Sequence, residues 1–410
     1  MRYSNFFSIF LCLTGHFVFA QGYLTLSGKI IDKQTQRPVP HAYVGILAKG
    51  TGTIANDDGQ FFYRFPRITA DSNLVVAVLG YKMFVKKASS YPLNQKDVVI
   101  ELEAARPQIL DSSFIRRFEA LDLVREALAK IKKNNPQAPY LLNGFYQETL
   151  QQDGAYVDIK EATMQTEKDP RPKIPIPEKV RAVRGRVFAS ENRDKVMENY
   201  AFPNGAVIVT HSVEIKIPEY LDGKNLGDYT FQADDTVSYY LDKPVYQIHF
   251  SPVRPSVTAA RNGLICISGA DSAIVKIEYE MTPEGVKDVM KTSSSDKLFG
   301  NKTKREPRRL YTQINYKPFN GKYYLQDYQL RLDTEFEQNK KKIVGSIRLH
   351  FVTTDILKSN GTRIPETDIL INTDAFDPQF IPKYEDNLWG VNNYILPTAA
   401  MRQIAETLQK

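Results

Sequence analysis

The 410-residue sequence has only two cysteines, Cys12 and Cys266, and it lacks long hydrophobic runs. Cys12 lies within a short apolar run, Phe6–Leu13, which we expect to be removed with the N-terminus, so the mature chain keeps one cysteine and no internal disulfide. No later run reaches the roughly 18 apolar residues of a membrane-spanning helix. The sequence therefore predicts a chain that folds by packing alone, without a transmembrane span.

An excess of one charge is also missing. The 54 lysines and arginines are nearly balanced by 47 aspartates and glutamates, for a formal net charge of +7. Such a mixed surface provides no extended cationic field for nucleic acid. The basic clusters at 302–309 and 340–342 lie between strand-like segments and are expected to be solvated hairpin loops. Contact with acidic lipid or polysaccharide is the alternative.

Motifs of catalysis are lacking as well. The sequence contains no Gly-x-Ser-x-Gly elbow and no phosphate-binding glycine loop. The mature histidines lie in strand-like stretches, and no two of them stand at a metal-ligand spacing, so structural or surface roles are expected for His41, His211, His249 and His350.

Other reactive side chains have simple interpretations. Cys266 alternates with Leu264 and Ser268 and is expected to be a small core residue. Asp333, Glu335 and Glu337 share one face of a strand and could form a carboxylate cluster, but solvated charges at a strand end are the expected reading. The sequence thus predicts no catalytic, cofactor-binding or metal-binding residue and favours a protein that is not an enzyme.

The N-terminus is typical of an export signal. Arg2 precedes the apolar run, and Val18-Phe19-Ala20 provides a cleavage site after Ala20. Leu11 before Cys12 does not fit a lipoprotein site. We expect residues 1–20 to be a signal peptide and the mature protein to be exported to the periplasm or the outer membrane.

Residues 24–103 follow as short apolar and aromatic strands separated by turns. Asn56-Asp57-Asp58-Gly59 is one such turn, because asparagine, aspartate and glycine tolerate positive φ. Strands this short, with turns every few residues, predict a β-sandwich. Asp32, Asp57 and Asp58 could be imagined as calcium ligands, but the turn lacks the alternating acidic pattern of a calcium loop.

Five pieces of this region resemble the carboxypeptidase regulatory-like family. They are Gly28–Asp32, Pro38–Val44, Gly52-Thr53, Asn56–Phe61 and Leu79–Tyr81. The resemblance implies a transthyretin-like sandwich that is itself non-catalytic. Such modules stand at the N-terminus of secreted envelope proteins, including TonB-dependent outer-membrane transporters.

Residues 104–136 are expected to be a linker and an amphipathic helix. Asp111, Ser112 or Ser113 can cap the helix, and Asn134-Asn135-Pro136 ends it. Its apolar stripe has three- and four-residue spacing and consists of Phe118, Leu121, Val124, Leu128 and Ile131. Packing on the following sheet is expected, and lying on a membrane is the alternative.

Residues 137–410 are dominated by strands of period two. Asn320-Gly321 is a strong hairpin signal, and Ile343–Phe351 is predicted to pair with Tyr328–Phe336. A proline-rich stretch, 169–181, is expected to be a loop, and Met401, Ile404 and Leu408 predict a C-terminal helix. We expect a mainly β or α+β fold with one large, curved antiparallel sheet, covered on one face and wet on the other.

Three further pieces resemble exported proteins described as carboxypeptidase-like regulatory domain-containing. They are Tyr140–Glu148, Tyr156–Ala162 and the aromatic segment Asp386–Ile395. The resemblance implies an architecture and an envelope location, and it does not imply an activity. The sequence features together favour a non-enzymatic envelope protein, a binding or scaffold module with an outer-membrane or surface partner. A periplasmic carrier of lipid or lipoprotein and a glycan-binding protein of an uptake system are the alternatives.

Overall fold

The computed structural model describes residues 22–109, 119–170, 178–198, 205–214, 216–291, 303–338, 340–358, 363–370 and 387–408. Most of these residues lie in strands. The predicted signal peptide, the predicted helix caps at 111–113 and most of the proline-rich stretch lie outside the described residues. Lys179–Arg181, which we expected to belong to a loop, begin a strand instead.

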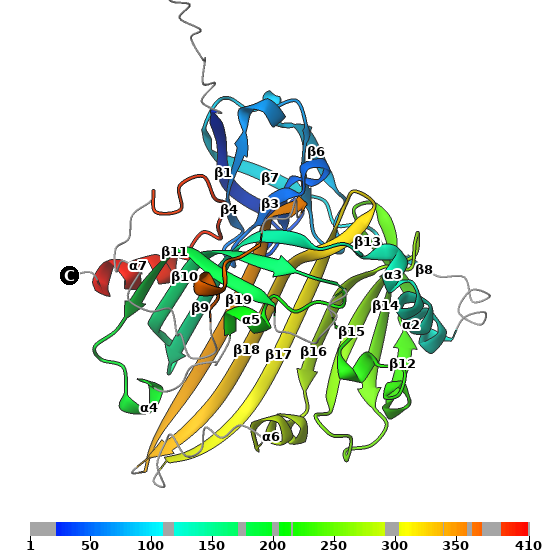
Figure 1. Cartoon of the computed structure of the whole chain (residues 1–410), viewed down its shortest axis with the longest axis vertical. Coiled ribbons are helices and arrows are strands. Elements are labelled where there is room, and N and C mark those ends of the chain that lie inside the picture. Colours follow the sequence, from blue (N-terminus) through cyan, green and yellow to red (C-terminus); the bar gives the residue numbers. More distant parts are fainter. Residues whose placement is uncertain are drawn as a thin grey trace, which may run out of the picture.

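The N-terminal residues form the predicted β-sandwich (Figure 1). One sheet has the order β4-β1-β7 and consists of β1 (Tyr23–Asp32), β4 (Gln60–Pro66) and β7 (Gln95–Leu102). The other has the order β3-β2-β5-β6 and consists of β2 (Tyr43–Ile46), β3 (Thr51–Ile54), β5 (Asn73–Ala77) and β6 (Phe84–Lys87). Three short 3-10 helices connect strands: η1 (Leu47–Lys49), η2 (Arg67–Thr69) and η3 (Ala88–Ser90). Alternate side chains of β4, among them Phe61, Tyr63 and Phe65, fill the core between the sheets.

The rest of the described chain is organised by one sheet of twelve strands, ordered β11-β10-β9-β19-β18-β17-β16-β15-β14-β13-β8, with β12 paired to β14. The strands are β8 (Gln108–Ile109), β9 (Tyr140–Gln152), β10 (Ala155–Lys168), β11 (Lys179–Ala189), β12 (Tyr229–Ala233), β13 (Thr236–Tyr240), β14 (Lys243–Pro252), β15 (Arg261–Ser268), β16 (Ile274–Met281), β17 (Thr303–Phe319), β18 (Lys322–Gln338) and β19 (Lys341–Lys358).

All pairings in this large sheet are antiparallel, and two local predictions are confirmed in it. Asn320 and Gly321 form the β17–β18 turn with φ of 48° and 72°, the positive values that a two-residue hairpin with a right-handed twist requires. Tyr328–Phe336 pairs with Ile343–Phe351 in β19 as expected.

Neighbouring rows across the sheet show its two faces. One row is apolar and runs through Ile248, Ile265, Ile277, Ile314, Tyr328, Phe351 and Tyr146. The adjacent row points to the opposite face and is polar, with Gln313, Gln329, His350, Gln147, Glu161 and Arg186 on six consecutive strands. We call these the apolar face and the polar face.

The chain between β11 and β12 packs against the apolar face. Val209, Val213 and Tyr220 belong to the same buried cluster as Ile277 and Tyr328. This connection carries α4 (Lys195–Glu198), α5 (Gly205–Ile208), η4 (Glu219–Leu221) and η5 (Leu226–Asp228), while α2 (Ala120–Ala129), α3 (Ile131–Asn134) and α6 (Pro283–Lys291) flank the sheet (Figure 1). The predicted amphipathic helix is thus split into α2 and α3, and α2 contacts β12 and β15.

The polar face is also partly covered, which corrects the expectation of a wet face. The sandwich sits against it, and α7 (Ala399–Leu408) packs on β10 and β11 through Met401 and Ala405, which contact Ile159 and Phe188. A last 3-10 helix, η7 (Glu366–Asp368), reaches β11 through ion pairs from Lys179 and Arg181. Within the described residues, no helix combines the length and apolar character needed to cross a membrane.

Candidate functional site

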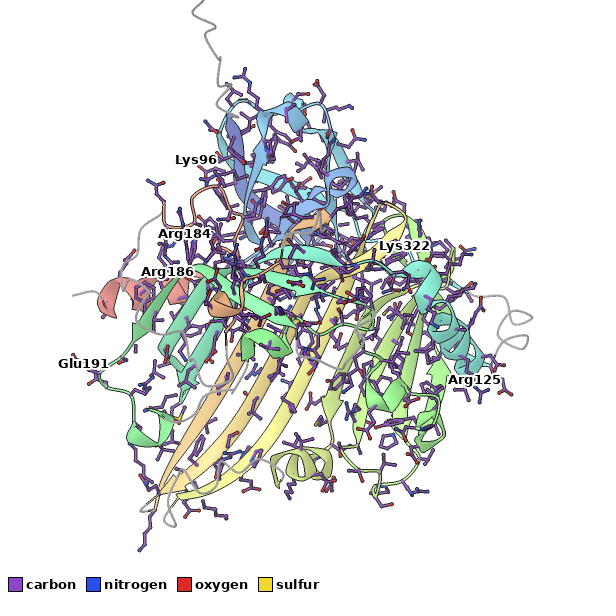
Figure 2. The ribbon with its side chains drawn as sticks, in the orientation of Figure 1. Lys96, Arg125, Arg184, Arg186, Glu191 and Lys322 are labelled. Atoms are coloured by element: carbon purple, nitrogen blue, oxygen red, sulfur yellow. The ribbon has the colours of Figure 1, made fainter. Side chains whose placement is uncertain are left out.

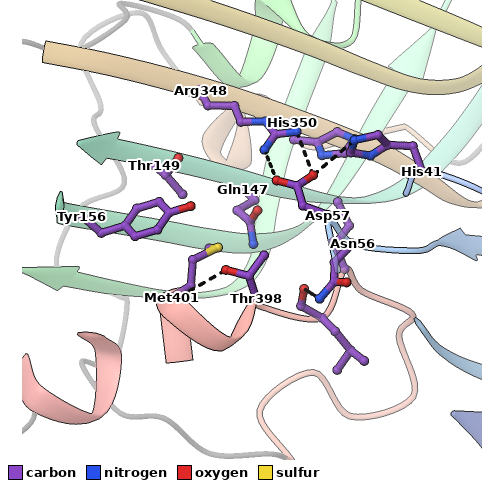
Figure 3. A pocket seen from close by; sticks show the side chains of 12 residues that line it. His41, Asn56, Asp57, Gln147, Thr149, Tyr156, Arg348, His350, Thr398 and Met401 are labelled. Carbon is purple, nitrogen blue, oxygen red and sulfur yellow. Dashed lines mark hydrogen bonds and ion pairs between the residues drawn. The ribbon is translucent and has the colours of Figure 1, made fainter. Parts of the chain in front are cut away.

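Histidine, arginine and carboxylate side chains gather where the sandwich meets the polar face of the large sheet (Figure 3). The turn between β3 and β4 places Asp57 over β19. His41 comes from the turn that precedes β2, where it has a positive φ of 57°. Arg348 and His350 alternate on β19 and therefore project from the same face. Asp327 enters from the neighbouring β18.

Asp57 is the centre of this group. Both terminal nitrogens of the Arg348 guanidinium donate to its carboxylate, Nη2 at 3.1 Å, and Nε2 of His41 lies 3.2 Å from it. Burial opposes ionisation of Asp57, but the hydrogen bonds from His41 and Arg348 outweigh burial and hold the pKa of the carboxyl well below its usual value. A carboxylate of such low pKa is a poor base near neutral pH.

His350 lies deeper than Asp57. Its ring centroid is 5.6 Å from that of His41, and its Nε2 is 3.8 Å from Oδ1 of Asp327, which is too long for a hydrogen bond. Burial lowers the pKa of His350 to about 4, although Asp327 acts in the opposite direction. His350 is therefore neutral at pH 7, held between a carboxylate and a second imidazole.

The pocket beside these groups is small. It lies between Asp57, Thr149, Tyr156, His350 and Met401 and has a volume of about 20 Å³, which is room for one water molecule and not for a metabolite (Figure 3). At this junction, three buried nitrogens have no hydrogen-bond partner among the described residues: Nδ1 of His41, Nε2 of Gln329 and Nε2 of His350. The arrangement can hold a solvent molecule.

A segment near the C-terminus locks the same junction. The side-chain amide of Asn393 pairs with the backbone of Arg64 as a neighbouring strand would, accepting from the amide nitrogen at 2.6 Å and donating to the carbonyl at 2.9 Å. Thr53 donates to the carbonyl of Tyr394 at 2.9 Å, and Asp58 accepts from the amide of Ala399 at the start of α7. Side chains of the sandwich thus hold the C-terminal segment in place.

Trp389 is the apolar anchor of this segment. It meets Phe145 edge to face, with ring centroids 5.0 Å apart, in a buried cluster with Ile54, Val352 and Ile395. Arg186 of β11 lies over its ring at 5.1 Å, and Figure 2 shows Arg186 beside the C-terminal segment. Three parts of the chain, the sandwich, the sheet and the C-terminal segment, share one core here.

Lys317 ties the sandwich to the sheet from within. Its ammonium is buried, donates to the carbonyls of Gly50 at 3.3 Å and Thr353 at 3.1 Å, and lies 5.0 Å from the centroid of the Tyr43 ring. Burial lowers the pKa of Lys317 to about 7. The lysine is used for cohesion between the two units, because no pocket reaches it among those that line the junction.

A second, larger cavity of about 200 Å³ opens on the other side of His41. Its sandwich wall is apolar and includes Val78 and Leu79, and its sheet wall is rich in amides. Asn315 and Gln326 both donate to the carboxylate of Asp327 at 3.0 Å, so their orientation is fixed. The full lining is Pro40, His41, Ala77, Val78, Leu79, Tyr240, Val275, Lys276, Gln313, Asn315 and Gln326.

The other residues considered from the sequence remain apart from this junction. His249 pairs with Asp234 at 3.0 Å, and His211 follows α5, so His211 and His41 do not lie on strands as we expected. Cys266 is buried, and burial raises the pKa of its thiol to about 12. Within the described ranges, no group of three or more histidines, cysteines and carboxylates could hold a metal ion.

The carboxylates of interest have local partners. Asp333 accepts from Arg331 at 3.0 Å and from Ser346 at 2.6 Å, and Glu335 pairs with Arg308 and Lys342. Asp32 accepts from backbone amides of its own turn, those of Gln34 and Thr35. Asp32, Asp333 and Glu335 therefore have partners within the protein.

Comparison with known proteins identifies the N-terminal unit. The model of the CarboxypepD_reg-like domain family matches residues 26–111, so these residues form a domain of that family, as the sequence predicts. The match ends near β8, where the chain passes from the sandwich to the edge of the large sheet. No curated protein matches the chain.

Two solved structures were compared with the whole fold. A DUF1329 family protein from Desulfovibrio piger has 7% identity and a TM-score of 0.27, over 62% of this chain and all of that one. A proposed thioesterase II from Thermobifida fusca has 10% identity and a TM-score of 0.09, over 60% of this chain and 91% of that one. Both scores are too low to inform the fold or the function of the large sheet.

Proposed function

We propose that the protein is a non-enzymatic, exported cell-envelope protein that acts as a binding or scaffold module for an outer-membrane or surface partner. One observation carries this proposal: the ionisable side chains at the junction join the sandwich to the sheet. Asp57 is bound by Arg348 and His41, and the pocket beside them has room for one water molecule. A regulatory-like domain that is fixed in this way supports a role in presenting a surface.

A crosslinking experiment in the native envelope tests the proposal. A photoreactive amino acid at Val99, which is 60% exposed on β7 of the sandwich, is expected to give one discrete adduct with a second polypeptide. The same probe at Val253, which is 45% exposed beyond β14, is the control and should give none. Absence of an adduct from Val99 and from other exposed sandwich positions would contradict a partner-binding sandwich.

Glycan binding is a second candidate, and the larger junction cavity favours it. A sugar presents an apolar face of C–H groups and an edge of hydroxyls, which matches one apolar wall with Val78 and Leu79 and one wall of amides. Gln313 and Asn315 are the side chains to test. Isothermal titration with a panel of neutral mono- and disaccharides should show binding that Gln313→Ala weakens, and a silent panel would argue against this candidate.

Transport of a lipid or lipoprotein has less support. A carrier would use the apolar face of the sheet, and this face is packed by residues of the chain itself, among them Val209, Val213 and Tyr220. Tyr220 stacks on Phe250 with ring centroids 5.6 Å apart. A lipid would therefore have to displace the connection between β11 and β12 before it could bind there.

A further inference from the structure

Three segments meet at the end of the sandwich that lies away from the large sheet (Figure 1). The amide of Arg67 donates to the carbonyl of Gly22 at 2.8 Å, and the amide of Ser89 donates to the carbonyl of Ala70 at 2.7 Å. The side chain of Asn94 accepts from the amide of Thr25 at 3.1 Å. We call residues 22–25, 66–73 and 86–97 together the tip.

Large apolar side chains stand exposed on each segment of the tip. Ile68 on η2 is 86% exposed, Leu93 before β7 is 62% exposed, and Tyr23 at the start of β1 is 38% exposed. Single exposed aliphatic residues are common on protein surfaces, but here they project from neighbouring loops at one end of a domain. They lie on a protruding end and do not line either of the junction cavities.

Basic residues outnumber acidic residues in the tip. The ionisable residues of the tip are four basic ones, Arg67, Lys86, Lys87 and Lys96, and two acidic ones, Asp71 and Asp97.

The contacts of these cations leave them facing solvent. Lys86 lies over the ring of Tyr91 at 4.4 Å, and Lys87 donates to the backbone carbonyl of Asp71, so neither is neutralised by these contacts. No ion pair of Arg67 or Lys96 is found within the part of the chain that the structure describes, and Figure 2 shows Lys96 projecting outward from the sandwich.

We propose that the tip docks onto the surface of an anionic lipid bilayer. Ile68 and Leu93 enter the boundary between headgroups and acyl chains, and the four cations meet the headgroup phosphates. Aliphatic side chains on protruding loops that carry an excess of lysine and arginine suit a soft anionic surface, because such a surface needs no matching groove. A protein partner would instead favour a flatter patch with aromatic anchors in pockets.

Docking at the tip would hold the sandwich between the bilayer and the large sheet. The sheet and its junction with the sandwich would then face away from the lipid, with the cavity of about 200 Å³ accessible from solvent. This inference requires a membrane surface near the protein but does not depend on the identity of a protein partner, so it can fail without affecting the crosslinking result.

Vesicle co-sedimentation tests the inference. The chain beginning at Gln21 is used, so that the apolar run Phe6–Leu13 cannot contribute. Vesicles of phosphatidylglycerol and phosphatidylethanolamine are compared with vesicles of phosphatidylcholine alone. We expect binding to the anionic vesicles only, weakened by salt because surface charges are screened.

Two tip variants and one control separate a specific site from general adhesion. Ile68→Asp with Leu93→Asp should weaken binding at least about tenfold, because two aliphatic side chains no longer enter the boundary layer. Arg67→Glu with Lys96→Glu should weaken it by a similar factor and abolish the preference for anionic lipid. Val253→Asp, at an exposed valine outside the tip, should bind as the unchanged chain does.

The thermal unfolding transition of each variant shows whether it is folded, and the substituted side chains are exposed, so folding should be retained. No sedimentation with anionic vesicles would overturn the inference. Binding that is unaffected by the tip substitutions, or equally weakened by Val253→Asp, would also overturn it. Capture of a protein at the tip without lipid binding would assign this surface to a protein interface instead.

Discussion

Arg348 and Asp57 lie 291 positions apart in the sequence and form a two-pronged ion pair between the large sheet and the sandwich. Arg348 also donates to Gln329 at 3.0 Å, so its guanidinium is fixed on the sheet before it reaches the sandwich. Because the guanidinium is held in this way, the half-exposed ion pair has a defined geometry. The pair therefore sets the position of the turn that carries Asp57 and Asp58.

The ion pair should contribute measurably to docking of the sandwich. A double-mutant cycle with Asp57→Ala and Arg348→Ala is expected to give a coupling free energy of about 1 kcal/mol, since the pair is partly exposed and bidentate. Each single variant should speed hydrogen exchange at β3, which contacts β19. The matched cycle on Arg331 and Asp333, a pair within the sheet, should leave exchange at β3 unchanged. Equal effects of both cycles would contradict a role at the junction.

The buried imidazole of His350 predicts a pH dependence of stability. Its pKa falls from 6.5 to about 4 on folding, so the unfolded chain binds the extra proton between these values. The free energy of unfolding should therefore decrease by up to about 3 kcal/mol as the pH falls through this window. Denaturant titrations at pH 7, 5.5 and 4.5 measure this decrease in the free energy of unfolding.

His350→Gln should remove most of this slope, and His249→Gln, at a histidine that is 55% exposed, should leave it in place. Protonation of Asp57 should reduce stability only at lower pH, because the pKa of this carboxyl is lowered. An unchanged slope in His350→Gln would show that His350 is not the group responsible.

The buried ammonium of Lys317 predicts a pH dependence of stability with the same sign in a higher pH range. Burial lowers its pKa from 10.5 to about 7, so the unfolded chain holds more protons than the folded chain between these values. Stability should rise by up to about 3 kcal/mol from pH 7 to pH 9. Lys317→Met keeps most of the length of the side chain and should flatten this rise, whereas Lys322→Met, at a partly exposed lysine, should not. A rise that survives in Lys317→Met would contradict the assignment.

The C-terminal segment should be part of the folded core. Trp389→Ala is expected to cost about 3–5 kcal/mol, because it removes the largest side chain of the cluster with Phe145 and Ile395. Val391→Ala, two residues on and 53% exposed, should cost less than about 0.5 kcal/mol. Chemical denaturation monitored by circular dichroism gives both values. Similar small costs for the two variants would mean that the segment is only loosely attached.

Local features of the fold could be predicted from the sequence because their causes are local. The Asn320-Gly321 turn needs two residues that accept positive φ. The strand Ile343–Phe351 shows its alternation of apolar and polar residues directly in the sequence. The sandwich was predictable for the same reason, with the added help of a family pattern in residues 26–111.

The junction could not be predicted in this way. His41 and His350 are 309 positions apart and come within 5.6 Å only after the sandwich has docked on the sheet. Asn393 imitates a strand through its side-chain amide, which no backbone pattern signals. The splitting of the amphipathic helix and the cover over the polar face likewise depend on contacts between distant segments, so periodicity alone overestimated the exposed area of the sheet.

The central claim is that the junction builds a surface for a partner and does not perform a reaction. Native mass spectrometry of the protein released gently from its own envelope tests it most directly, with His41→Gln/His350→Gln as the matched variant. We predict a complex with a second polypeptide in fixed stoichiometry, retained when both imidazoles are replaced. A bare mass, or bound lipid without a second polypeptide, would contradict the account.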